Sequence, residues 1–225
     1  MTTTAAALAE KMKKKELRRE FLARRKALSP AERRLLDAAI AARIAGLECW
    51  ARAKGVVAYA GDGQEPDLSA VCRLALAEKK TLALPRFEAA AGVYQPVEVT
   101  DLGTDLVTGK YGLMEPRAEL PAAAPDADWI WLIPGVAFDA AGTRLGRGKG
   151  YYDRLLAVYG GVKIGVFYRM QFFAGRLPCA AHDRKLDLAV TEIETVKFDP
   201  ARADEPAAPE QLNQRKNQRQ CLTKS

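Results

Sequence analysis

Cations and glycines alternate in one stretch of the sequence, P-G-V-A-F-D-A-A-G-T-R-L-G-R-G-K-G-Y-Y-D, at residues 134–153. Glycine has no Cβ, so backbone N–H groups in such a stretch can approach an anion closely. Arg144, Arg147 and Lys149 add positive charge, and the free N–H groups at the start of a following helix add more. The stretch predicts a nucleotide or phosphate site, although a charged, glycine-rich surface turn would explain the same residues equally well.

The glycine spacing matches neither of two common nucleotide motifs. No Ser or Thr follows Lys149 to hold Mg²⁺, as in a P-loop, and G-R-G-K-G lacks the G-x-G-x-x-G spacing of dinucleotide folds. The context nevertheless favours a ligand site, because an apolar run at 129–133 precedes the stretch and an apolar-patterned segment at 155–159 follows it. A glycine loop between a buried strand and a helix is a common ligand position in open α/β sheets.

Asp153 and Asp187 are the carboxylates that could hold a metal ion. Mg²⁺ takes one or two carboxylates together with substrate phosphates and water. Asp153 follows the glycine-rich stretch, and Asp187 begins a later predicted strand. Stabilisation of a helix start by Asp153, and a surface ion pair of Asp187, explain these residues equally well.

Other polar residues give weaker signals. Glu65 follows a predicted strand and could accept hydrogen bonds from an amino-bearing heterocycle, but an exposed turn glutamate is the more ordinary interpretation. His182 is the only histidine and has no identifiable partner, so we interpret it as structural or exposed. No Ser–His–Asp or Cys–His arrangement can be argued, which disfavours covalent hydrolase chemistry.

Composition limits the class of protein. The 225 residues are 48% hydrophobic, enough for one sizeable core, and no apolar run approaches the ~18 residues of a membrane span. The N-terminus lacks the charged and apolar regions of a signal peptide. Four cysteines form no C-x-x-C pair and there is one histidine, so we expect no zinc site. These features indicate a reduced, cytoplasmic protein.

The excess positive charge lies at the N-terminus. Residues 1–34 contain eleven Lys or Arg and four Asp or Glu, whereas the rest of the chain has 24 of each. A helix is predicted at 11–28, in which Lys14, Arg18 and Arg25 share one stripe beside an apolar one. These cations could hold their charged ends at a pocket rim, or form a solvated face. The local charge argues against a broad nucleic-acid-binding surface.

The remaining elements predict an α/β fold. Ser29, Pro30 and Glu32 form a capping signal for a second helix. Predicted strands then alternate with helices, at 55–60, 81–84, 129–133, 163–167 and 186–190 as the last core strand, with a helix at 67–79 and an antiparallel arm at 93–99. This order favours a three-layer, mostly parallel open sheet with helices on both faces, Rossmann-like, preceded by an N-terminal helical segment. We expect a single domain at 11–198, with disordered ends at 1–10 and 199–225.

Four motifs in this order resemble the 5-formyltetrahydrofolate cyclo-ligase family, also called methenyltetrahydrofolate synthetases. The strongest match is the glycine-rich stretch at 134–153. The others are K-K-E-L-R at 14–18, Y-G-L-M-E-P at 111–116 and H-D-R-K-L-D at 182–187. The resemblance extends over residues 14–198. One departure is Glu65-Pro66-Asp67-Leu68, where the family usually has Glu-x-x-Thr.

The resemblance implies an enzyme that uses ATP and Mg²⁺ to close 5-formyltetrahydrofolate into 5,10-methenyltetrahydrofolate, releasing ADP and phosphate. It further implies a cytoplasmic monomer whose partner is the small-molecule folate, with or without a polyglutamate tail, and neither nucleic acid nor membrane. By similarity, the residues that contact ATP would be Lys14, Lys15, Glu16, Leu17, Arg18, Arg144, Leu145, Gly146, Arg147, Gly148, Lys149, Gly150, Tyr151 and Tyr152. Those that face the folate would be Arg18, Ala60, Glu65, Arg147, Gly148, Lys149, Gly150 and Tyr151.

The resemblance also implies catalytic roles. Arg147 and Lys149 would stabilise transition-state charge and Tyr152 would orient the formyl group. Asp153 and Asp187 would hold the metal ion. Two other classes are compatible with the residues alone: a phosphosugar-binding enzyme on a similar fold, and a non-catalytic protein that binds RNA or an acidic partner through the basic helix.

Overall fold

The structure is a computed structural model that describes residues 2–109, 112–180 and 183–199. His182, Tyr111 of the Y-G-L-M-E-P motif and the predicted tail from residue 200 lie outside the described residues. Within the described ranges, no helix has both the length and the apolar character needed to cross a bilayer.

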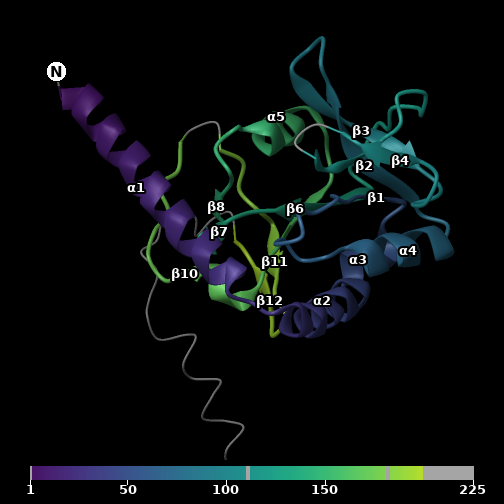
Figure 1. Cartoon of the computed structure of the whole chain (residues 1–225), viewed down its shortest axis with the longest axis horizontal. Helices are drawn as coiled ribbons and strands as arrows, with labels where there is room; N and C mark the ends of the chain where they lie inside the picture. The colour runs from purple at the N-terminus through teal and green to yellow at the C-terminus, as the bar shows by residue number, and fades with distance from the viewer. Residues whose placement is uncertain (1, 110–111, 181–182, 200–225) are drawn as a thin grey trace, which may run out of the picture.

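A seven-stranded sheet forms the centre of the protein (Figure 1), in the order β12-β11-β9-β6-β1-β2-β3. The five inner strands are parallel, and the two edge strands β3 and β12 are antiparallel to their neighbours. The strands are β1 (Gly55–Val57), β2 (Thr81–Glu88), β3 (Val93–Val99), β6 (Trp129–Pro134), β9 (Val162–Val166), β11 (Leu188–Val190) and β12 (Thr195–Lys197). The mostly parallel sheet and the central position of the 129–133 strand confirm the predicted fold class.

Both faces of this sheet are covered, because alternate residues of a strand point to opposite faces. In β6, Ile130 and Leu132 pack with the cluster that contains residues of α2 and α4, whereas Trp131 and Ile133 pack with residues of α5. Figure 1 shows α2, α3 and α4 on one side and α5 on the other. These helices are α2 (Pro30–Ala45), α3 (Glu48–Arg52), α4 (Ser69–Ala77) and α5 (Tyr151–Val158).

The glycine-rich stretch contains more structure than the loop that the sequence predicted. Strands β7 (Ala137–Asp139) and β8 (Arg144–Leu145) form a hairpin, and β10 (Phe172–Phe173), after the 3₁₀ helix η2 (Arg169–Gln171), pairs with β7. The buried Asp139 carboxylate closes the hairpin turn by accepting hydrogen bonds from Ala141 and Thr143 N–H, and it accepts another from Leu177 N–H. The second half of the stretch is therefore held in a defined place.

Helix α1 (Thr2–Lys26) packs on this small sheet. Leu17 and Phe21 are buried against Val136 and Leu145. The helix begins nine residues before the predicted start, so residues 2–10, which the sequence analysis expected to be disordered, are helical. This stretch is rich in alanine, which has a high helix propensity. The prediction missed the helix here because the stretch has no apolar stripe.

Other boundaries also differ from expectation. β2 continues through Pro85 to Glu88, because this strand lies next to an edge and its outer half pairs only with β3. The predicted last core strand at 186–190 is β11, two residues shorter at its start, and the edge strand β12 follows it. The capping box of Ser29 and Glu32 is confirmed at the start of α2. A separate two-stranded sheet joins β4 (Leu106–Thr108) to β5 (Met114–Pro116).

Candidate active site

A cleft of about 860 Å³ opens at the carboxyl ends of β1, β2 and β6. This is the edge where open parallel sheets bind ligands. Most of the predicted site residues line the cleft, although they come from segments far apart in the sequence. They are Lys14, Arg18, Ala60, Glu65, Arg144, Leu145, Gly146, Arg147, Gly148, Lys149, Gly150, Tyr151, Tyr152 and Asp153.

The glycine loop, residues 146–150, forms one wall of the cleft. Gly148 has a φ of +94° and Gly150 a φ of +64°, values that favour glycine. Gly150 is also the N-cap of α5. The loop therefore joins directly to a helix N-terminus, whose free N–H groups and positive dipole end suit a phosphate group.

Helix α1 closes the cleft from the other side. The Nε of Arg18 donates a hydrogen bond of 2.7 Å to the carbonyl of Gly146. The Nζ of Lys14 lies 3.4 Å from an Asp183 carboxylate oxygen. Burial lowers the pKa of Arg18, and the nearby Asp183 charge offsets part of this effect. The basic stripe predicted from the sequence therefore reaches the glycine loop, and its third member, Arg25, is completely buried behind the cleft.

Lys149 projects from the loop as an exposed side chain. Among the described residues, no hydrogen bond or ion pair engages its ammonium group, whereas its carbonyl accepts a hydrogen bond from Arg154. An unengaged ammonium at a cleft wall is suited to bind a phosphate oxygen as a point charge.

Aromatic side chains line another part of the cleft. The ring of Tyr151 lies 4.8 Å from that of Tyr94 and 6.1 Å from that of Phe87, in edge-to-face geometry. Glu115, which is buried, accepts hydrogen bonds from the Tyr94 hydroxyl and the Phe87 N–H. This group presents aromatic surface to a ligand with a flat ring system.

Arg144 connects Tyr152 with Asp153. Its Nη2 lies 2.9 Å from Asp153 Oδ1, and its guanidinium carbon lies 5.7 Å from the centre of the Tyr152 ring. Burial raises the pKa of Tyr152, so its hydroxyl stays protonated at neutral pH and can donate a hydrogen bond. The side chain of Asp153 is 18% exposed, and its Oδ1 also accepts from Arg184 N–H.

An acidic loop, residues 61–67, faces the glycine loop. Arg147 is ion-paired with Asp62 and lies 3.4 Å from Glu65. Asp62 Oδ1 accepts hydrogen bonds from Gln64 and Glu65 N–H, which fixes the turn that carries Glu65. Burial and the Asp62 charge raise the pKa of Glu65, and the two arginines Arg147 and Arg25 offset this in part. Glu65 is thus a largely buried acceptor rather than an exposed turn residue.

Four predicted residues do not line the cleft. Lys15 and Glu16 are exposed on α1 and Leu17 is buried against the small sheet, because a helix turns neighbouring residues to different faces. Asp187 lies at the amino end of β11, where its carboxylate accepts hydrogen bonds from the backbone N–H and Nζ of Lys163. The cleft is at the opposite edge of the sheet, so Asp153 and Asp187 do not converge.

Several cleft residues were missed by the sequence analysis. Asp62, Tyr94, Glu115 and Asp183 all line the cleft. Asp62 could have been found, because the G-D-G sequence after a strand signals a turn at the ligand edge of the sheet. Tyr94 and Glu115 lie in segments whose pairing depends on long-range packing, which no local pattern reports.

The carboxylates of the cleft do not form a metal cage by themselves. In the described part of the chain, no group of three or more His, Cys, Asp or Glu could hold a metal ion. Mg²⁺ that is bound mainly by nucleotide phosphates needs only one or two protein carboxylates. Asp153, in the first turn of α5 and next to the glycine loop, has the position and chemistry for that role.

Comparisons with known proteins show which chains have a similar sequence and fold. The NMR structure of Aquifex aeolicus 5,10-methenyltetrahydrofolate synthetase matches with a TM-score of 0.72 and 37% identity, over 82% of this chain and 92% of that chain. A 5-formyltetrahydrofolate cyclo-ligase of Mycolicibacterium smegmatis is 35% identical over 153 residues, covering 64% of this chain and 74% of the relative. A probable 5-formyltetrahydrofolate cyclo-ligase of Schizosaccharomyces pombe is 28% identical over 173 residues, covering 70% and 84%.

A model of the 5-formyltetrahydrofolate cyclo-ligase family matches residues 10–192, which include α1 from residue 10 onward, the acidic loop and the glycine loop. The match confirms the resemblance that the sequence motifs indicated. The ordered motifs and the fold lead to the same assignment. This chain belongs to the 5-formyltetrahydrofolate cyclo-ligase family.

Proposed function

We propose that the protein uses ATP and Mg²⁺ to convert 5-formyltetrahydrofolate into 5,10-methenyltetrahydrofolate, with release of ADP and phosphate. One observation carries the proposal: the cationic glycine loop and the aromatic and acidic groups line a single cleft. The loop suits a polyphosphate, and the aromatic and acidic walls suit a pterin with amino groups. The two reactants of the proposed reaction would therefore meet in one place.

The proposed reaction needs positioning and charge stabilisation more than a protein nucleophile. The γ-phosphoryl group passes from ATP to the formyl oxygen, and ADP leaves. The N10 nitrogen then attacks the activated carbon and loses its proton, and phosphate departs with the former formyl oxygen. Arg147 and Lys149 stabilise charge on the transferring group, and the Tyr152 hydroxyl orients the formyl oxygen.

Mg²⁺, when bound, would neutralise charge on the phosphates. Asp153 is the proposed protein ligand, since Asp153 Oδ1 contacts Arg144 and Arg184 while the side chain retains exposure to the cleft. Arg144 would hold the carboxylate in orientation.

The folate would bind between the acidic loop and the aromatic group. Glu65 would accept hydrogen bonds from the pterin amino and ring N–H groups, beside Ala60. Tyr151 and Tyr94 would contact the flat parts of the substrate. Arg18, which is fixed to Gly146, would complete the wall between the two ligands.

The test is to incubate the protein with 5-formyltetrahydrofolate, ATP and Mg²⁺, and to follow the absorbance of the methenyl product and the release of phosphate. Product formation that requires all three components is the expected result. A folded protein that forms no product would refute the proposal. Folate-independent processing of a phosphosugar, or RNA binding with a steep salt dependence, would favour the two other classes instead.

We extend the proposal to a monomer that acts in the cytoplasm and binds neither nucleic acid nor membranes. Sedimentation at several concentrations tests the monomer, and the location of a fluorescent fusion tests the action in the cytoplasm. A concentration-dependent mass would contradict the monomer.

A further inference from the structure

Two arginines contact the same two carboxylate oxygens at the wall of the cleft. Arg147 is ion-paired with Oδ2 of Asp62, and its Nε lies 3.4 Å from Oε1 of Glu65. Arg25 reaches the same atoms, with Nη2 at 3.8 Å from Asp62 Oδ2 and Nη1 at 3.9 Å from Glu65 Oε1. The two carboxylates are therefore shared between a cation of the glycine loop and a cation of α1.

The two arginines differ in their freedom to move. The side chain of Arg147 is 49% exposed and lies in a glycine-rich loop, whereas that of Arg25 is 0% exposed. Nη1 of Arg25 donates to the Gly135 carbonyl at 3.2 Å. Arg147 can turn toward a ligand, but Arg25 cannot leave its position.

Arg25 also has unused hydrogen-bonding capacity. Among the described residues, no partner accepts from its Nε or Nη2, although both atoms are buried. A buried donor without a partner normally destabilises a protein. The Nη2 of Arg25 is aimed at Asp62 Oδ2 across 3.8 Å, a gap that a small movement of Asp62 would reduce to a hydrogen bond.

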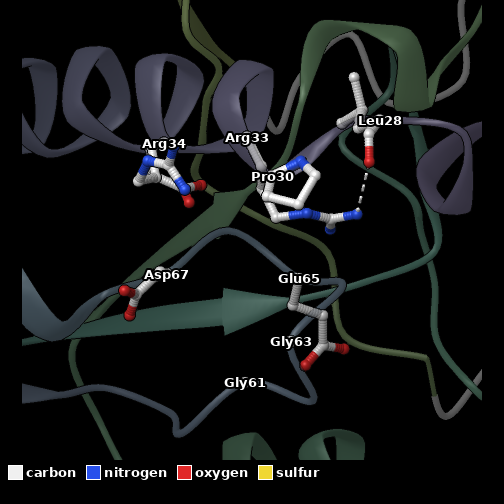
Figure 2. Close-up of a pocket in the computed structure, with 9 residues that line it drawn as sticks. Leu28, Pro30, Arg33, Arg34, Gly61, Gly63, Glu65 and Asp67 are labelled. Carbon is white, nitrogen blue, oxygen red and sulfur yellow. Dashed lines mark hydrogen bonds between the residues drawn. The ribbon is translucent and has the colours of Figure 1, made fainter.

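The loop that carries both carboxylates is held by the same region of the chain. Arg33 donates to the Gln64 carbonyl at 2.7 Å and to the carbonyls of Arg25 and Leu28. Figure 2 shows the hydrogen bond from Arg33 to Leu28, with Glu65 nearby. Glu65 lines a second cavity of about 440 Å³ as well as the cleft. The junction between α1 and α2 thus sets the position of the acidic loop.

We propose that Arg25 is a positioning residue, which takes over Asp62 and Glu65 when Arg147 turns to an anionic ligand. In the ligand-free protein Arg147 neutralises these carboxylates. Without a second cation, its departure would leave two adjacent negative charges uncompensated at a partly buried site, which is costly. Arg25 lowers this cost, so that Arg147 is available for phosphate while Glu65 keeps its place for the substrate.

The inference rests on the proposed function for the identity of the anion, so its test includes a measurement without any reaction. The Arg25→Met variant removes the buried charge at similar volume. Arg147 then becomes the sole arginine on the two oxygens and is held more tightly. We expect the Kd of Mg-ATP, measured by calorimetry, to rise about tenfold. This rise corresponds to only part of the energy with which two charges ~4 Å apart interact near a protein surface.

The ligand-free measurement is the pKa of Glu65, followed by carboxyl NMR. The groups that act on Glu65 are Arg25 of α1, Tyr59 and Asp62 after β1, and Arg147 and Tyr152 of the glycine loop and α5. Because Arg25 favours the ionised form, Arg25→Met should raise the pKa of Glu65. The matched control is Arg24→Met, which removes a neighbouring cation that pairs with Glu20 on the outer face of α1. This control should leave both readouts unchanged.

Asp62→Asn gives a second test that does not depend on the folding of an Arg25 variant. The amide oxygen can still accept from Gln64 and Glu65 N–H, but the shared negative charge is lost. The pKa of Glu65 should fall, and Arg147 should be released, so that Mg-ATP binds at least as tightly as in the wild type.

The outcomes separate the two proposals. If Arg25→Met lowers thermal stability but leaves the Glu65 pKa and the Mg-ATP affinity unchanged, Arg25 has only a structural role. An unchanged Glu65 pKa in Asp62→Asn would lead to the same conclusion. If the wild type forms no methenyl product but both variants shift the pKa of Glu65 in opposite directions, the proposed reaction fails and the charge sharing stands.

Discussion

Replacing Asp153 with asparagine tests the connection between α5 and the glycine-rich stretch. The carboxylate lies 2.9 Å from Arg144 Nη2, and the two side chains are 18% and 5% exposed. The Nε of Arg144 is buried without a partner among the described residues, and its Nη1 reaches the Pro134 carbonyl only at 3.4 Å. The variant would therefore leave a buried cation with little compensation.

The expected size of the effect follows from this geometry. Two unit charges ~4 Å apart interact by about 4 kcal/mol at an effective dielectric constant of ~20. Removing one partner of a buried pair costs about 3–5 kcal/mol. Because the asparagine oxygen still accepts a hydrogen bond, we expect the lower end, about 3 kcal/mol. At ~2–4 °C per kcal/mol for a chain of this size, the melting temperature should fall by about 6–12 °C.

The assay is thermal unfolding followed by circular dichroism, with Glu48→Gln as control. Glu48 forms an i,i+4 pair with Arg52 in which both side chains are more than 70% exposed, so its loss should shift the melting temperature by no more than about 2 °C. An equal shift in both variants would refute the reasoning from burial. Asp153→Asn should also raise the Mg²⁺ concentration needed for half-maximal cyclisation, if Asp153 is the metal ligand.

Three further results are expected. Lys149→Met should lower turnover by about 10²–10³-fold with an unchanged melting temperature, because the proposed role of its exposed ammonium is to stabilise transition-state charge and not the fold; normal turnover would contradict this proposed role. Asp187→Asn should leave the Mg²⁺ requirement unchanged, since Asp187 binds Lys163 at the other edge of the sheet; a raised requirement would reinstate it as a ligand. Burial raises the pKa of Glu65 in the folded state, so ionisation of Glu65 reduces stability as pH rises through that pKa. The melting temperature of Glu65→Gln should therefore rise relative to that of the wild type as the pH increases from 4 to 8. A difference between the two melting temperatures that does not change with pH would contradict this.

Much of the fold could be predicted because its signals are local. The apolar runs of the parallel strands, the capping box of Ser29 and Glu32, and the alternation of strands with helices depend on residues close together in the chain. The helical start of α1 was missed because alanines give propensity without an apolar stripe. Strands β7 and β8 were missed because they are very short and their hairpin depends on the buried Asp139 carboxylate.

The site was predictable where motifs carry the chemistry. The glycine loop, Lys14, Arg18 and Glu65 were all assigned from the sequence, and all line the cleft. Helical and strand periodicity says which residues share a face of one element, but not what lies opposite that face.

Tertiary structure alone decided which charges meet. Arg18 reaches Gly146 across 128 positions of the chain, and Arg25 reaches Gly135 across 110. Asp187 shares a motif with Asp183, yet the first lies at the amino end of β11 and the second lines the cleft. Local pattern and ordered motifs were enough to predict the family, the layered sheet and the position of the glycine loop. The sharing of Asp62 and Glu65 between Arg25 and Arg147 required the packing of α1 against the sheet edge, since only that packing buries one cation and leaves the other exposed.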